Sequence, residues 1–120
     1  MSIIQKLRDW RREHIEELNN ADIESSVKDT IYPGHCDNKL SLGFKKNNVL
    51  LSFTSWNRAD LGKIFTEIIV FNQASDETIL VLDQEWSADI KVIKCLTETI
   101  KKLVEGGFEN ERLDKGLANR

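Results

Sequence analysis

Proline, cysteine and long apolar runs are all scarce in this sequence of 120 residues. The chain has one proline and two cysteines, Cys36 and Cys95, which form no CxxC pair of the kind that binds zinc. We therefore expect two unpaired thiols, as is usual in the cytosol. No apolar run approaches the roughly 20 residues that a membrane-spanning helix needs, so we expect no membrane partner.

Positive charge is not in excess either. Lysine and arginine number 17 against 20 aspartate and glutamate, for a net charge of −3, and affinity for nucleic acids comes mainly from positive charge. Lys6, Arg8 and Asp9 also place charge too early for the apolar core of a signal peptide. The sequence thus predicts a cytoplasmic protein that binds no nucleic acid.

Motifs for catalysis and for metal or cofactor binding are missing as well. The two histidines, His14 and His35, belong to no HExxH motif, and no glycine-rich phosphate-binding pattern occurs. The only cluster of reactive side chains is His35-Cys36-Asp37, and adjacent residues of an extended segment point in opposite directions. We expect a turn there, and no catalytic residue, metal, cofactor or small-molecule substrate. The alternative is a small enzyme or ligand-binding domain that uses this triplet.

Apolar residues recur at helical spacing near both ends of the chain. The first predicted helix ends at Asn19-Asn20, and its apolar stripe consists of Ile3, Leu7, Trp10, His14 and Leu18. The second has Ser87 as its expected N-cap, Asp89 in its first turn and Gly106-Gly107 after its end. Its expected stripe consists of Ile90, Ile93, Leu96, Ile100, Leu103 and Val104.

Between the two helices the apolar pattern alternates with a period of two, as it does in strands. Two strands around the polar loop 45–48 are expected to bury Leu40, Leu42, Phe44, Val49, Leu51 and Phe53. Further strands are predicted over 63–71 and 78–85, and a weaker one over 23–31. Because every connection is too short for a parallel crossover, the strands should form an antiparallel meander. The predicted fold is α+β, with an N-terminal helix, a four- to five-stranded sheet and a C-terminal helix, and both helices on one sheet face.

These elements make up a single predicted domain over residues 1–107. A chain of this length can bury a core without disulfides or metals. Residues 108–120 are rich in charge and show little periodicity, so we expect a flexible tail there.

Two helices cover only one face of such a sheet, and the other face must meet solvent or a partner. In the strand over 63–71, either of two alternating sets can face the interior. If Ile64, Ile68 and Val70 do, the uncovered face combines aromatic, hydroxyl and charged side chains, which is typical of binding surfaces. The alternative is that Trp56 packs against the turn at 59–61 or under the tail. The residues expected on or beside this face are Ser41, Ser52, Thr54, Trp56, Asn57, Arg58, Phe65, Glu67, Ile69 and Phe71.

Acidic residues are concentrated between positions 63 and 87, where five of them stand against Lys63 alone. Such a charge steers a basic partner, and Asp76 and Glu77 are the candidate steering residues. The alternative is a solvated acidic edge that prevents strand-to-strand aggregation.

Four segments follow one another in an order that is typical of a known family. They are the helical run Trp10–Leu18, the strand Val49–Trp56 that ends in tryptophan, the strand with Glu67-Ile68-Ile69-Val70, and Glu77-Thr78-Ile79 before a closing amphipathic helix. Over roughly residues 5–105, this order resembles the Tri-Tu-type immunity proteins. Asn57-Arg58 stands where that family commonly has a glycine, and the tail is longer, so the toxin specificity stays open.

The resemblance implies a small cytoplasmic α+β protein that protects a bacterium from an ADP-ribosyltransferase toxin of the Rhs or type VI secretion kind, whose target is translation elongation factor Tu. The implied mechanism is occlusion: one immunity protein binds one toxin domain over its NAD⁺ or target-binding cleft and does no chemistry. A type III-like secretion chaperone, small, acidic and usually dimeric, is the alternative. The predicted partner-binding residues are Ser52, Thr54, Trp56, Asn57, Arg58, Glu67, Asp76 and Glu77.

Overall fold

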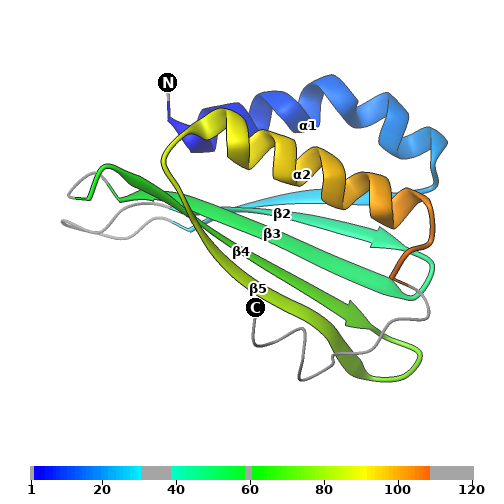
Figure 1. Cartoon of the computed structure of the whole chain (residues 1–120). Coiled ribbons are helices and arrows are strands. Elements are labelled where there is room, and N and C mark those ends of the chain that lie inside the picture. Colours follow the sequence, from blue (N-terminus) through cyan, green and yellow to red (C-terminus); the bar gives the residue numbers. More distant parts are fainter. Residues whose placement is uncertain (1, 31–38, 59–60, 109–120) are drawn as a thin grey trace.

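The computed structural model describes residues 2–30, 39–58 and 61–108 of the chain. A five-stranded sheet forms one layer, and two helices lie side by side on one of its faces (Figure 1). The predicted α+β architecture is thereby confirmed. The elements in chain order are α1 (Ile3–Asn20), β1 (Glu24–Thr30), β2 (Lys39–Lys46), β3 (Val49–Arg58), β4 (Lys63–Asn72), β5 (Glu77–Trp86) and α2 (Asp89–Val104).

The strands form the predicted antiparallel meander in the order β1-β2-β3-β4-β5. The β2–β3 turn is shorter than the expected loop, because β2 runs on to Lys46 and β3 begins at Val49. Asn47 takes a positive φ of 55° there, and Asp76 takes 56° in the β4–β5 turn. Asparagine and aspartate tolerate this left-handed conformation better than other non-glycine residues, which explains why tight turns form at these positions.

The register of the central strands decides which residues of β4 face the helices. Phe53 pairs with Leu42 on one side and with Ile68 on the other, and all three side chains are buried. Since side chains alternate along a strand, Ile64 and Val70 share the buried face with Ile68. The first of the two sets considered for this strand is therefore the inward one.

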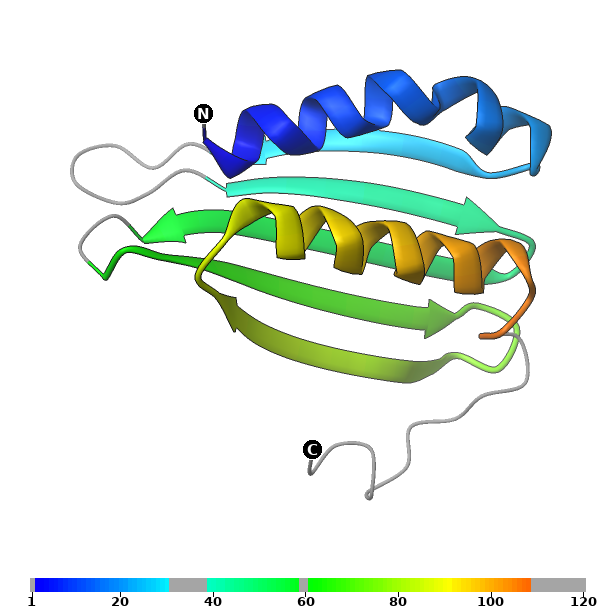
Figure 2. The ribbon, with the colours of Figure 1, turned by 45° about the horizontal axis from the view of Figure 1, so that its top comes forward.

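The two helices run parallel to each other, with α1 packed on the β1–β3 side of the sheet and α2 nearer β5 (Figure 2). Trp10 Nε1 donates a hydrogen bond to Thr97 Oγ1 at 3.1 Å, and Lys6 pairs with Asp89 at 3.1 Å near the N-terminal ends. His14 stacks on Trp10 with ring centroids 4.3 Å apart. The two helices thus form one layer that seals the core.

The start and the buried face of α2 differ from the prediction. The N-cap is Ala88 rather than Ser87, and it makes no side-chain capping bond. Ile90 is 73% exposed and Val104 is 44% exposed, so neither belongs to the stripe. Aliphatic residues lie around much of this helix, and docking on the sheet selects the buried face. That face consists of Val92, Leu96, Ile100 and Leu103.

Replacing Ala88 with serine is expected to raise the free energy of unfolding by about 1 kcal/mol, because a serine at this position can accept a hydrogen bond from the first turn of α2. Ala88 already has the extended backbone of an N-cap, with φ −145° and ψ 138°. Urea denaturation measures the change. Ser87→Ala is the matched control and should leave stability nearly unchanged; a loss of stability in that control would restore Ser87 as the cap.

The packed core reaches as far as Phe108, which is buried and has Lys102 Nζ 4.7 Å from its ring centre. Residue 108, the first of the expected tail, therefore packs with the domain. Residues 109–120 lie outside the described part of the chain, as does the His35-Cys36-Asp37 triplet. Within the described residues, no helix is long and apolar enough to cross a membrane.

Candidate protein-binding surface

The sheet face opposite the helices, called here the open face, carries a graded set of side chains. Strand alternation and register place lysines on β1 and β2, apolar side chains mainly on β3 and β4, and carboxylates toward β5. The face is therefore apolar in the middle and oppositely charged on its two sides. Its members include Lys28, Lys39, Lys45, Leu50, Trp56, Phe65, Ile69, Phe71, Val81, Asp83 and Glu85.

An aromatic cluster occupies one end of the open face. Trp56 meets Phe65 edge to face, with centroids 5.8 Å apart and planes at 65°. Lys39 Nζ lies 4.1 Å from the centre of the Trp56 ring, and the guanidinium carbon of Arg58 lies 5.6 Å from that of Phe65. Both rings are partly exposed. These contacts hold two large aromatic groups in place while leaving surface available to a partner.

Hydroxyl groups lie beside the aromatic cluster. Ser41 Oγ and Thr54 Oγ1 are 2.7 Å apart and share a hydrogen bond, and Thr54 pairs in register with Glu67 on β4. Ser52 lies two positions from Thr54 on the same strand face. The structure thus brings Ser52, Thr54, Trp56 and Glu67 together on the open face, as the sequence analysis expected.

Arg58 also belongs to this face, where it lies over Phe65, whereas three other predicted residues lie elsewhere. Asn57 points to the helix side, where its Oδ1 accepts a hydrogen bond from the backbone N–H of Ile3 at 3.2 Å and fastens the start of α1 to the sheet. Asp76 and Glu77 are exposed at the β4–β5 turn. This turn follows Asn72, which is about 24 Å along β4 from Phe65 at ~3.4 Å per residue. These two carboxylates therefore lie too far from Trp56 to share a contact patch with it.

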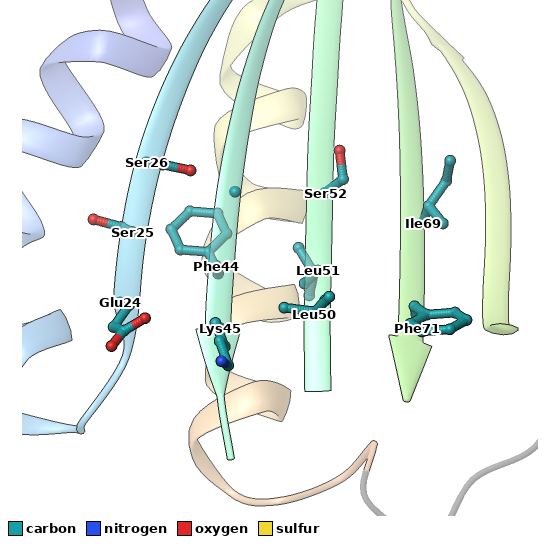
Figure 3. A pocket seen from close by; sticks show the side chains of 11 residues that line it. Glu24, Ser25, Ser26, Phe44, Lys45, Leu50, Leu51, Ser52, Ile69 and Phe71 are labelled. Carbon is teal, nitrogen blue, oxygen red and sulfur yellow. The ribbon is translucent and has the colours of Figure 1, made fainter. Parts of the chain in front are cut away.

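Two shallow hollows interrupt the open face. One, of about 380 Å³, lies over Gly43 and is bordered by side chains of β1 to β4 (Figure 3). A Cβ atom added at Gly43 would lie only 2.7 Å from Ser26 Oγ, so the hollow depends on the missing side chain. The other, of about 370 Å³, lies beside Trp56, Phe65, Asp83 and Glu85. Each hollow adjoins both apolar and charged groups, which suits a protruding side chain of a partner.

The cysteine in the described part of the chain lies on α2, not on the open face. Cys95 is half-buried on α2, and desolvation raises the pKa of its thiol despite a hydrogen bond with Thr99. A raised pKa disfavours the nucleophilic thiolate. In the ranges 2–30, 39–58 and 61–108, no three His, Cys, Asp or Glu side chains are grouped so that they could hold a metal ion.

Two features of the open face were not predicted from the sequence: the basic side, which includes Lys39 and Lys45, and the hollow over Gly43. The pairing of Lys39 with Trp56 depends on where the β2–β3 turn falls. A shift of one residue would move every side chain to the other face. The Asn47-Asn48 pair was the available signal for the turn, but the prediction of a four-residue loop over 45–48 left the register open.

Searches against known protein families, curated proteins and solved structures find no match. Function is therefore inferred from the geometry of the open face together with the order of elements in the sequence.

Proposed function

We propose that this chain is a protein-binding domain, specifically a cytoplasmic immunity protein that binds an antibacterial ADP-ribosyltransferase toxin. In this proposal the open face covers the NAD⁺ or target-binding cleft of one toxin domain, so that the toxin is inhibited by occlusion. The chain contributes contacts rather than chemistry.

The observation that carries the proposal is the aromatic cluster of Trp56 and Phe65 on the sheet face opposite α1 and α2. Large aromatic residues and arginine dominate the energy of protein interfaces, especially where neighbouring groups exclude water. Here Lys39 and Arg58 flank the two rings. Such an arrangement supplies both an apolar anchor and polar contacts around it.

The dimensions of the open face support the same proposal. Five strands spaced ~4.8 Å apart and up to ten residues long span about 24 by 34 Å, or roughly 800 Å². A standard protein interface takes about 800 Å² from each partner. One toxin domain would therefore fill this face, in keeping with a one-to-one complex.

The type of toxin comes from the resemblance to Tri-Tu-type immunity proteins, and the acidic character of the β4–β5 side accords with it. Glu67, Asp83 and Glu85 face outward on this side, while Asp76 and Glu77 lie at the turn. Together they create a negative field that favours approach of a basic surface. The cytoplasm is the compartment in which the toxin would meet its inhibitor.

Co-expression rescue tests the proposal. The toxin domain encoded directly upstream of this chain is expressed in a sensitive bacterium, with and without the full chain, and survivors are counted. We expect rescue, together with a stable one-to-one complex by light scattering. Absence of rescue by a folded, expressed chain would contradict the proposal. A homodimer that holds its partner partly unfolded would point instead to a secretion chaperone.

A further inference from the structure

The open face carries charges of opposite sign on its β1–β2 side and its β5 side. We infer that the partner binds in one orientation, with one bulky apolar side chain in the hollow over Gly43, acidic groups over β1–β2 and basic groups over β5. This inference rests on the proposed function, because the partner is the toxin domain of that proposal. It adds the chemistry that the toxin surface must present.

The charges on the two sides of the open face are of opposite sign. On β1 and β2 three lysines, Lys28, Lys39 and Lys45, stand against one carboxylate, Glu24. The other side carries three carboxylates on β4 and β5, namely Glu67, Asp83 and Glu85. Arg58 and Lys63 are register partners beside the β3–β4 turn, where Arg58 lies over the Phe65 ring, so this end of the open face also carries positive charge.

A partner turned end for end across the strands would place like charges against one another. Juxtaposed like charges in an interface suppress the wrong arrangement, while complementary ones fix the register. An acidic group opposite the lysines and a basic group opposite Asp83 and Glu85 therefore define a single favoured orientation. The separation of the charged sides by an apolar middle makes this preference stronger than that of a mixed surface.

The hollow over Gly43 lies between the two charged sides. Ser26 on β1 and Ser52 on β3 border it on either side of Gly43. Ile69 lies beyond Ser52, and the end of the hollow is formed by Glu24, Lys45, Leu50 and Phe71 (Figure 3). Its volume of about 380 Å³ is more than ten times the ~30 Å³ share of one water molecule. The mainly apolar walls suit a leucine or an aromatic side chain of the partner, and both charged residues at the rim, Lys45 and its register partner Glu24, can contact groups beside it.

Charge reversal tests the orientation, with affinity for the purified upstream toxin domain measured by biolayer interferometry. Lys45→Glu and Asp83→Lys should each weaken binding about tenfold at low salt, with a smaller loss at high salt. Their matched controls are Lys94→Glu and Glu98→Lys, which make the same changes on exposed positions of α2. The controls change the net charge by the same amount but lie on α2, away from the open face, so they should bind like the unmodified chain.

Filling the hollow tests the anchor. Ser52→Phe places a ring in the hollow and should also weaken binding about tenfold, whereas Ser75→Phe, at an exposed turn position, should not. Each variant is first compared with the unmodified chain by urea denaturation.

The outcomes separate the inference from the proposed function. If the toxin domain binds the unmodified chain but its affinity changes equally in the open-face variants and their controls, the inference is overturned and the proposed function stays intact. Tighter binding by either charge-reversed face variant would also overturn it. A toxin domain that fails to bind the unmodified chain would overturn both.

Discussion

Replacing Phe53 with alanine is expected to lower the free energy of unfolding by about 3–5 kcal/mol, the usual cost of deleting a buried aromatic ring. Phe53 is fully buried on the central strand, between Leu42 and Ile68. The cavity left behind would open between the sheet and both helices. Because small domains have only about 5–15 kcal/mol of stability, this one substitution would remove a large part of it.

Urea denaturation followed by circular dichroism measures this loss. Leu61→Ala is the control, because Leu61 is 52% exposed at the end of the sheet, and it should change stability by less than about 0.5 kcal/mol. A loss below about 1.5 kcal/mol for Phe53→Ala would show that the ring is not the centre of the core.

Replacing Trp56 with alanine is expected to weaken toxin binding by about 2 kcal/mol or more, which corresponds to roughly 30-fold, while the fold is kept. Trp56 is partly exposed on the open face and contacts Phe65 and Lys39 rather than the helix-side core. Its removal takes the largest apolar surface from the proposed interface and also removes the contact between the Trp56 ring and the Lys39 ammonium. Calorimetric titration with the toxin domain measures the change.

The control for this experiment is Ile90→Ala, which trims an exposed apolar side chain of α2 on the opposite side of the molecule. Its affinity should equal that of the unmodified chain. Unchanged affinity in a folded Trp56→Ala variant would remove Trp56 from the interface.

Strand alternation was sufficient to predict most of the fold, and the failures have physical causes. Leu40, Leu42 and Phe44 alternate with small or polar residues, so the buried face of β2 could be predicted. In β4, apolar residues occupy both faces, and only the pairing of Ile68 with Phe53 identifies the buried set. In α2 the apolar residues are spread widely, so contact with the sheet, rather than periodicity, selects Val92 over Ile90.

The candidate surface was predictable to the extent that it follows from alternation within one strand. Ser52, Thr54 and Trp56 share a face of β3 for that reason. Asn57 lies next to Trp56 in sequence and therefore on the other face, where its Oδ1 accepts a hydrogen bond from the backbone N–H of Ile3 at the start of α1. The position of Lys39 beside Trp56 depends on the register between β2 and β3. The sequence alone does not provide that register.

The pairing of the first helix with the last has a consequence for how the chain folds. Each strand of the meander pairs with its neighbour in sequence, so the sheet can assemble hairpin by hairpin as the chain leaves the ribosome. The bond between Trp10 and Thr97 joins residues 87 positions apart. The first helix therefore completes its packing only after α2 has been made, and until then the indole N–H of Trp10 lacks the Thr97 hydroxyl as its partner.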